Sequence, residues 1–510
     1  MRLVFLFLLT ALAACGVAPA QPRTHWIFFT AKDTTAPPAL APAALQARAA
    51  RHLPLDATDQ PVSGTYLARL RQLGVGIRCR SRWLNAVSAV LTPAQEQAVR
   101  RLPFVREVRA VATGVVITAT PTPHEPAKLA PVLAQIQAEA FAAAGLTGRF
   151  VPIGVVDAGF FGADSAAVLR PIARRGGFRQ VRDYVNQPAT KNQLFRTLET
   201  MSDLHGTEVL AAIGGLDPAG QLQLGLGYEA SFYLARTDAG NRETRGEEDN
   251  WIQAVEWLDS LGVRLVNTSL GYAKGFTNPA ENYRPGQMDG HTSLISQAAQ
   301  LATDKKGMLI IVSAGNEGDD RSWRVISTPA DAEGVLAVGA TNARLWSRIS
   351  YSSIGPQALP YLKPNVACFS LYGTSLAAPV ITGFAACLMQ ANPALTNRQL
   401  RDIIEQSAHL YPYGNNFVGY GVPQATRALA LLRGEPLPPT SRQLQATGTK
   451  LTVLIPGEDR PITLFRKQDT THVLQQMVGR VSRGQLTLRQ LPGERYTTID
   501  LKTEVIEVVW

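Results

Sequence analysis

The chain has 510 residues, of which 45% are hydrophobic and 18% are charged, and it carries a formal net charge of +10. This length predicts about two to four domains, and the apolar content excludes a chain that is disordered throughout. Four cysteines are too few for a disulfide scaffold, and no cluster of Cys and His has metal-ligand spacing, so we expect no metal and no cofactor.

Residues 1–20 resemble an export signal peptide. Arg2 supplies the positive start, residues 3–13 form an apolar stretch too short to span a bilayer, and Ala18-Pro19-Ala20 fits a small-residue cleavage site. A competing interpretation is the run 12–15, which resembles a bacterial lipoprotein box with Cys15 as the lipidated residue. Both interpretations predict export. The first gives a secreted, extracellular protein, and the second gives a protein anchored by lipid in the cell envelope.

Residues 21–115 have the pattern of a small α+β unit. Thr92 followed by Pro93 is a typical helix start, and this helix should end before Pro103. The other expected elements are strands at 26–30, 85–91 and 105–111 and helices at 42–51 and 64–73. A segment rich in Pro and Thr, residues 116–131, then predicts a linker and maturation region.

Residues 132–433 alternate strand and helix patterns, as in an α/β domain with a parallel sheet. The apolar run 151–156 predicts a buried strand, with Asp157 at its C-terminal end, where parallel sheets form their ligand crevices. His205 precedes the apolar run 209–213, which predicts a helix with the imidazole in its first turn. The sequence therefore predicts an acid and an imidazole at element boundaries of one sheet.

A hydroxyl and an amide follow in the same domain. Ser375 opens a small-residue helix, residues 377–389, so that its N–H lies at the positive end of the helix dipole. Asn316 follows the expected strand 308–312 through the tight turn Ser313-Ala314-Gly315. An acid, an imidazole, an amide donor and a hydroxyl are the groups that activate a serine and stabilise an oxyanion.

Four motifs in this order, V-V-D-A-G, H-G-T-E, S-A-G-N-E-G and Y-G-T-S-L-A-A-P, closely resemble those of the subtilisin family of serine peptidases. Subtilisin itself is the known example of the order Asp, His, Ser. The resemblance implies a three-layer parallel-sheet catalytic domain, with Asp157, His205 and Ser375 as a catalytic triad and Asn316 in the oxyanion hole. It also implies polypeptide substrates, hydrolysed through an acyl-enzyme. Calcium sites are common in the family, but no contiguous acidic loop identifies one here.

Two short segments are expected to hold the substrate. The stretch Ser269-Leu270-Gly271 resembles the strand that pairs with the substrate backbone by β-augmentation in this family, and its alternative is a plain core strand. The turn Ser313-Ala314-Gly315 before Asn316 is the second segment.

The run 85–111 resembles subtilase pro-segments, which implies a folding aid and autoinhibitor whose C-terminal tail occupies the active cleft. The alternative is a structural N-terminal domain that stays attached. Residues 21–110 hold thirteen Lys and Arg against five Asp and Glu, a net charge of +8. Because most of the positive charge sits in a segment expected to be removed, we predict no nucleic-acid partner; an exposed basic face that binds polyanions is the alternative.

Three features depart from the family pattern. Ala158 stands where many relatives have Thr or Ser, which removes one hydrogen-bond donor to the acid unless backbone amides compensate. Glu208 stands one turn beyond His205, where relatives usually have a second His, and we interpret it as a structural variation. Ser375 follows Ala367 after a shorter loop than in relatives, which affects the approach to the nucleophile and the back of the first specificity pocket.

The last segment, residues 434–510, begins with a Pro-rich linker and shows four short alternating stretches, which predicts a small all-β domain of the sandwich type. Such a domain is a binding or sorting module that attaches the protein to a surface, or a stability appendage. The expected strands lie at 451–455, 462–465, 485–491 and 503–508.

Together these features predict a secreted serine endopeptidase made as an autoprocessed zymogen. The alternative is an exported binding or scaffold protein on a degenerate, inactive subtilase fold, motivated by the shortened loop before Ser375. Intact Asp157, His205, Asn316 and Ser375 argue against it, because an inactive protein has no physical reason to retain all four.

Overall fold

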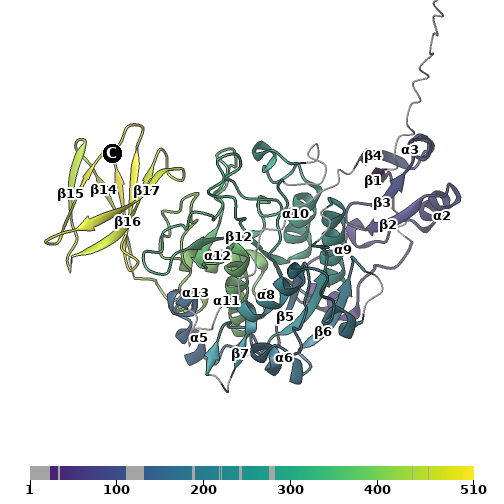
Figure 1. Ribbon diagram of the computed structural model, residues 1–510, viewed down its shortest axis with the longest axis horizontal. Helices are drawn as coiled ribbons and strands as arrows, with labels where there is room; N and C mark the ends of the chain where they lie inside the picture. Colours follow the sequence, from purple (N-terminus) through teal and green to yellow (C-terminus); the bar gives the residue numbers. More distant parts are fainter. Residues whose placement is uncertain are drawn as a thin grey trace, which may run out of the picture.

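The computed structural model describes residues 23–510 apart from 33–34, 111–130, 187–189, 218, 220, 241–243, 275–281, 439 and 458. Figure 1 shows the N-terminal unit (purple) and the C-terminal unit (yellow) at opposite ends of a central α/β unit. The predicted export signal, including Cys15, and residues 116–130 of the predicted linker lie outside the described residues.

The N-terminal unit is a four-stranded antiparallel sheet with the strand order β2-β3-β1-β4. Thr92 caps helix α3 in a reciprocal capping box with Gln95, which confirms the predicted helix start. Strand β2 was not predicted, because Arg78 and Arg80 interrupt its apolar pattern. The elements are β1 Arg23–Phe29, α1 Pro42–Ala49, η1 Ala57–Asp59, α2 Gly64–Gln72, β2 Gly76–Ser81, β3 Ala86–Leu91, α3 Pro93–Arg100 and β4 Val105–Ala110.

The central unit is built on a seven-stranded parallel sheet with the order β13-β12-β11-β10-β5-β9-β6. Both faces of the sheet are covered, which explains why its inner strands β5, β10, β11 and β12 are mostly apolar; the edge strand β6 alternates with polar residues. The strands are β5 Pro152–Asp157, β6 Phe178–Asp183, β9 Ser231–Arg236, β10 Leu265–Thr268, β11 Leu309–Ser313, β12 Leu336–Thr341 and β13 Val366–Phe369.

Helices form a layer on each face of this sheet, and the alternation along β11 shows how. Leu309 and Ile311 join a hydrophobic core with helices α8 and α11, whereas Ile310 and Val312 join a second core with helices α9 and α10. The helices of eight or more residues are α8 His205–Gly214, α9 Gly246–Ser260, α10 Leu294–Lys306, α11 Ala378–Ala391, α12 Asn397–Ser407 and α13 Ala425–Leu432.

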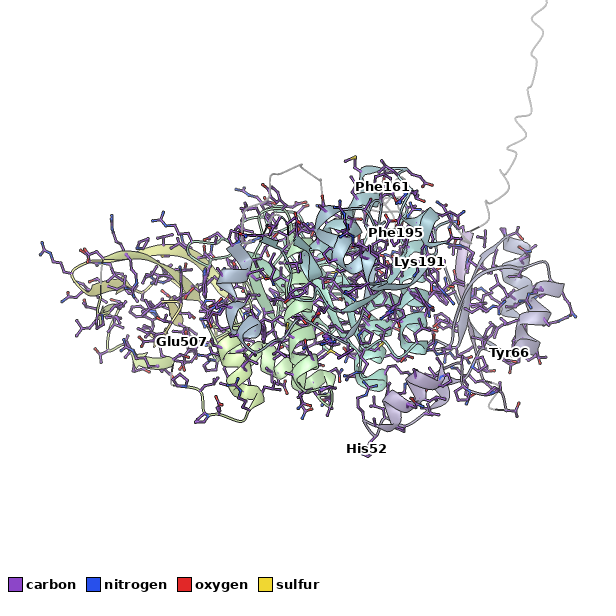
Figure 2. The ribbon with its side chains drawn as sticks, turned by 90° about the horizontal axis from the view of Figure 1, so that it is seen from below. His52, Tyr66, Phe161, Lys191, Phe195 and Glu507 are labelled. Atoms are coloured by element: carbon purple, nitrogen blue, oxygen red, sulfur yellow. The ribbon has the colours of Figure 1, made fainter. Side chains whose placement is uncertain are left out.

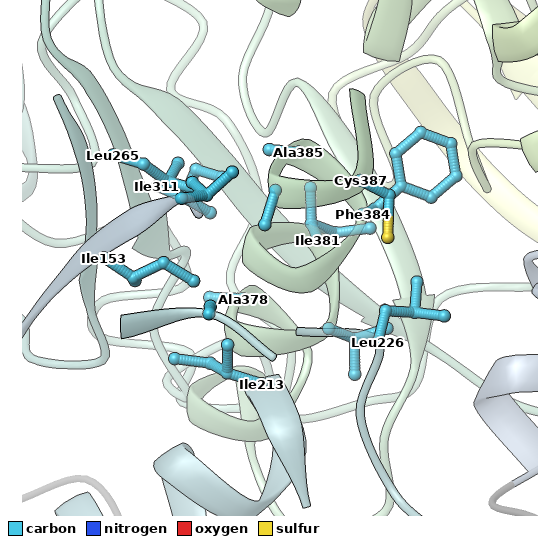
Figure 3. Packing of buried hydrophobic residues seen from close by; sticks show 14 of the residues in the cluster. Ile153, Ile213, Leu226, Leu265, Ile311, Ala378, Ile381, Phe384, Ala385 and Cys387 are labelled. Carbon is cyan, nitrogen blue, oxygen red and sulfur yellow. The ribbon is translucent and has the colours of Figure 1, made fainter. Parts of the chain in front are cut away.

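Helix α11 forms the centre of the first core. Figure 3 shows Ile153, Leu265 and Ile311, from three neighbouring strands, together with Ile381 and Ala385 of α11. The stretch Thr374–Ala391 is apolar and long enough to cross a membrane by length and composition alone, but 83% of it is buried in the protein. It is therefore a core helix of the central unit.

The C-terminal unit combines a five-stranded sheet, in the order β14-β20-β19-β16-β17, with the two-stranded sheet β15-β18. The four predicted strands are present, and β14, β17 and β19 are additional. Most residues of β17 are exposed or half-buried, so that it lacks the alternation that marks a half-buried strand. The strands are β14 Ser441–Gln445, β15 Lys450–Leu454, β16 Arg460–Lys467, β17 Val473–Val481, β18 Gln485–Arg489, β19 Tyr496–Asp500 and β20 Val505–Val509.

A shared hydrophobic cluster joins the C-terminal unit to the central unit. Phe465 and Val505 pack in it with Leu410, Phe417 and Val418. The predicted fold is therefore confirmed: an α/β central unit on a parallel sheet lies between a small α+β unit and a strand-rich unit. The shared cluster favours a stabilising role for the C-terminal unit.

We predict that Phe465→Ala destabilises the protein by about 3–5 kcal/mol, because the truncation opens a cavity in this shared cluster. Urea unfolding of the variant, made in a Ser375→Ala background to prevent autolysis, measures the loss. The control Leu474→Ala, on β17, removes a side chain that is 44% exposed and should change the free energy of unfolding by no more than about 0.5 kcal/mol. Equal stabilities of the two variants would contradict a supporting role for this junction.

Candidate active site

The acid and the imidazole predicted from the sequence are in direct contact. Asp157 is the last residue of β5 and His205 is the first residue of α8, and His205 Nδ1 lies 2.7 Å from Asp157 Oδ1. The backbone N–H of Ala158 also donates to Asp157 Oδ1, at 2.8 Å. A backbone amide therefore contacts the acid at the position where many relatives carry a hydroxyl side chain.

Ser375 lies beside the predicted substrate strand. Its Oγ donates to the carbonyl oxygen of Ser269 at 3.3 Å, and the Ser269 Oγ donates back to the Ser375 carbonyl at 2.8 Å. Ser375 sits in the 3-10 turn η6, Thr374–Leu376, which leads directly into α11. Two hydrogen bonds therefore join the residue that follows β10 to the turn that precedes α11, at the predicted nucleophile.

The Asn316 side chain is oriented by the residue before the serine. Its Oδ1 accepts hydrogen bonds from Thr374 N at 2.8 Å and from Thr374 Oγ1 at 3.0 Å. The amide nitrogen of Asn316 then faces Gly373, where an added Cβ would come within 3.1 Å of Nδ2. Gly373 has a φ of 107°, so glycine suits both the backbone and the close approach. Sequence reasoning missed Thr374, although it stands between two motif residues.

Among the described residues, His205 Nε2 and Asp157 Oδ2 have no hydrogen-bond partner, although both atoms are buried. A hydrogen bond between Ser375 Oγ and His205 Nε2 is thus not formed in this structure. Catalytic hydrogen bonds are often long without substrate and tighten in the substrate complex. The imidazole is held by Asp157 on one side, and in the described part of the chain no other acceptor or donor binds its second nitrogen in competition with a serine.

Acidic groups around His205 raise the pKa of its imidazole. Burial opposes protonation, but the charge and hydrogen bond of Asp157 outweigh it, and the charges of Glu208 and Asp238 act in the same direction. Burial raises the pKa of Asp238 to about 6, against the hydrogen bonds from Thr237 and Tyr272. Asp238 was missed from the sequence; its only signal is an acid two residues beyond the end of β9.

The two predicted substrate segments lie on either side of Ser327. An added Cβ at Gly271 would come within 2.1 Å of Ser327 Oγ, so a larger residue there would displace the Ser327 side chain. Ser327 N donates to the Ala314 carbonyl at 3.3 Å. Ser327 was not identified from the sequence, because it lies 56 residues after Gly271 and in a separate loop 12 residues after Gly315.

Two hydrogen bonds hold the shortened loop before Ser375, one within the loop and one from Tyr351. Ser370 Oγ donates to the Gly373 carbonyl at 2.7 Å, and Tyr351 OH donates to the Ser370 carbonyl at 2.7 Å. Cys368 and Cys387, on either side of this loop, are buried with free thiols. Within the described residues, no three His, Cys, Asp or Glu side chains are grouped to hold a metal ion.

Comparison with known families agrees with this geometry. The Subtilase family model (Peptidase S8) matches residues 148–421, more than half of the chain. The chain belongs to the subtilase family. A model of the Peptidase S8 propeptide domain, Bacteroidota, matches residues 24–125. The protein is therefore a subtilisin-like serine endopeptidase with an N-terminal pro-segment.

Individual relatives support the same assignment. Subtilisin NAT of Bacillus subtilis subsp. natto is 28% identical over 362 residues, which are 68% of this subtilase and 81% of that protein. Subtilisin DY of Bacillus licheniformis is 27% identical over 285 residues, which are 54% of this chain and 89% of that protein. The structure of the epidermin leader peptide processing serine protease of Staphylococcus aureus has a TM-score of 0.54 at 14% identity, and covers 80% of this chain and 99% of that one. At this identity the structural likeness supports the fold alone.

Proposed function

We propose that this subtilase hydrolyses peptide bonds with Ser375 as the nucleophile, His205 as the general base and Asp157 as the group that orients the imidazole. The observation that carries the proposal is the 2.7 Å contact between His205 Nδ1 and Asp157 Oδ1, at the sheet edge where Ser375 also lies. Ser375 Oγ attacks the scissile carbonyl and passes its proton to His205 Nε2. The imidazolium then protonates the leaving amine, and water hydrolyses the acyl-enzyme.

The developing oxyanion needs donors that are fixed before the reaction begins. The two hydrogen bonds from Thr374 hold Asn316 Oδ1, so the amide presents its nitrogen on the other side. We assign Asn316 Nδ2 and the Ser375 N–H as the two donors. The substrate backbone pairs with Ser269-Leu270-Gly271 on one side and Ser313-Ala314-Gly315 on the other.

The N-terminal unit acts as an intramolecular inhibitor until the chain is cleaved in the linker, and the protein is exported. The propeptide family match supports the first statement, and the resemblance of residues 1–20 to an export signal supports the second. Free secretion is the favoured localisation, and lipidation of Cys15 is the alternative. An inactive scaffold is the competing function, and the shared position of Asp157, His205, Asn316 and Ser375 at one sheet edge argues against it.

Replacement of the amide donor should slow turnover. We expect Asn316→Ala to lower kcat by ~10²–10³ with little change in KM, the size known for the equivalent loss in subtilisin itself. Steady-state kinetics on a peptide substrate measures both kcat and KM. Asn392→Ala, just after the far end of α11, is the matched control and should leave kcat unchanged. A rise in KM with kcat unchanged would instead make Asn316 a substrate-binding residue.

Activity should rise with pH, because His205 must be neutral to accept the proton. The pKa of His205 is raised in the folded enzyme, so kcat/KM should rise through an apparent pKa above the ordinary histidine value of about 6.5. Asp238→Asn removes a negative charge that favours the imidazolium, so the rise of kcat/KM should shift to lower pH. Asp304→Asn, an exposed acid on α10, should leave the profile in place. A profile that Asp238→Asn does not move would contradict the electrostatic role of Asp238.

Maturation should require the nucleophile. We expect the wild-type enzyme to cleave its own chain between about residues 112 and 130, and Ser375→Ala protein to stay full length after signal removal. N-terminal sequencing of both proteins measures this, and a fluorophosphonate probe should label the wild type and not Ser375→Ala. An active wild type that keeps residues 22–110 covalently attached rules out the zymogen. Correctly folded protein that resists the probe favours the inactive scaffold.

A further inference from the structure

A pocket lies at the junction of the central and C-terminal units, outside the active site. It has a volume of about 250 Å³. Its walls come from Arg344 and Leu345 in the loop after β12, from the first residues of β16, and from the turn between β19 and β20. Figure 2 shows Glu507, further along β20, well away from Phe161, whose carbonyl accepts a hydrogen bond from Thr207 of α8.

Hydrogen bonds between the two units hold the walls of this pocket. Thr463 Oγ1 of β16 donates to the Leu345 carbonyl at 2.9 Å, and Lys502 Nζ donates to the Arg344 carbonyl at 2.5 Å. The ammonium group of Lys502 also lies 5.3 Å from the centre of the Trp346 ring. Because both units fix the loop after β12, the shape of the pocket is set before any ligand enters.

Three cationic side chains line the pocket: Arg344 from the central unit, and Arg460 and Lys502 from the C-terminal unit. Among the described residues, neither arginine side chain forms an ion pair or a hydrogen bond. Burial lowers the pKa of Lys502, and the charges of Arg344 and Arg460 lower it further, against the opposing charge of Asp500. The three cations therefore repel one another, because like charges held close together in a partly buried site are poorly screened.

The acid in the pocket is already engaged in other contacts. Asp500 is 3% exposed; its Oδ1 accepts from Lys502 N at 2.7 Å, and its Oδ2 lies 3.2 Å from His409 Nε2. His409 Nδ1 accepts from the Val422 N–H at 2.8 Å, so the imidazole proton is on Nε2 and is donated to Asp500. With three cations and this one carboxylate among the described lining residues, the pocket keeps a formal net charge of +2.

We propose that this pocket binds a phosphate group, which bridges the central and C-terminal units. The guanidinium groups of Arg344 and Arg460 have the geometry that pairs with phosphate oxygens, and the Lys502 ammonium adds a point charge. A phosphate monoester carries a charge of about −1.5 to −2 at pH 7, which balances the net charge of the pocket. The volume of about 250 Å³ is below that of sites for drug-sized ligands, about 300–1,000 Å³, so we expect a single phosphate group to enter.

The phosphate group has two possible sources, a free ion or the head group of a phosphate-bearing lipid, because both present the same oxygens. In either case its partners come from both units at once. A ligand that binds the folded protein and not the unfolded chain stabilises the fold. The bound phosphate should therefore strengthen the attachment of the C-terminal unit to the central unit.

Binding is tested with full-length Ser375→Ala protein, which cannot digest itself, so the result does not depend on catalytic activity. Titration calorimetry with inorganic phosphate is the first measurement, at low and constant ionic strength because salt screens the cations. Sedimentation with vesicles of phosphatidic acid and phosphatidylcholine, compared with vesicles of phosphatidylcholine alone, is the second. Binding of inorganic phosphate identifies the free ion as a ligand, and binding to the phosphatidic acid vesicles alone identifies a lipid head group.

Arg344→Met and Arg460→Met should each weaken binding of the effective probe at least about 10-fold, because each removes one charge-assisted pair with the phosphate. Neither substitution breaks a hydrogen bond of the described residues, so both variants should fold, which circular dichroism checks. Arg489→Met is the matched control: it removes the same charge at an exposed position of β18 and should leave the affinity unchanged. The proposal is overturned if the parent binds neither probe, or if either pocket variant binds as tightly as Arg489→Met.

Discussion

The parallel register of three neighbouring strands is the constraint on which the active site depends. Thr268 of β10 pairs with Val156 of β5 on one side and with Val312 of β11 on the other. The residues that directly follow these three along the chain are Asp157, Ser269 and Ser313, and they therefore lie at the same edge of the sheet. A one-residue slip in any of these pairings would point the side chain of its residue to the opposite face of the sheet. The apolar residues that alternate between the two cores fix this register, so the core also positions the chemistry.

The charged groups that act on His205 also lie near this edge of the sheet. Three carboxylates act on one buried imidazole: Asp157 by contact, and Glu208 and Asp238 through their charge. Burial alone would lower the pKa of His205 and weaken it as a base. The surrounding acids reverse that shift, and burial in turn raises the pKa of Glu208 and Asp238. The departure from the family pattern at Glu208 is therefore part of the field that acts on His205.

What the sequence could predict depended on whether the signal was local. The helix start at Thr92, the strand that ends at Asp157 and the helix that begins at His205 are each encoded within a few residues, and all three predictions were close to the structure. Strands β2 and β17 carry polar residues where the pattern requires apolar ones and were missed. Ser327 was also missed, because its position beside Gly271 arises from tertiary packing. The buried ion pairs of Arg48 with Asp259 and of Asp59 with Lys306 could not be predicted, since the two partners of each pair lie more than 200 residues apart along the chain.

The positive charge of the pro-segment has a physical explanation within the chain. Helix α9 presents three acids to the pro-segment, Asp249, Glu256 and Asp259, and all three are buried beneath it. Arg82 lies 2.5 Å from Asp259 and 3.7 Å from Glu256, while Arg78 lies 3.7 Å from Asp249. Such clustered acids on one helix face repel each other unless cations are brought to them. Arg78 and Arg82 of the pro-segment supply cations to this face, so part of the basic composition of the pro-segment complements α9.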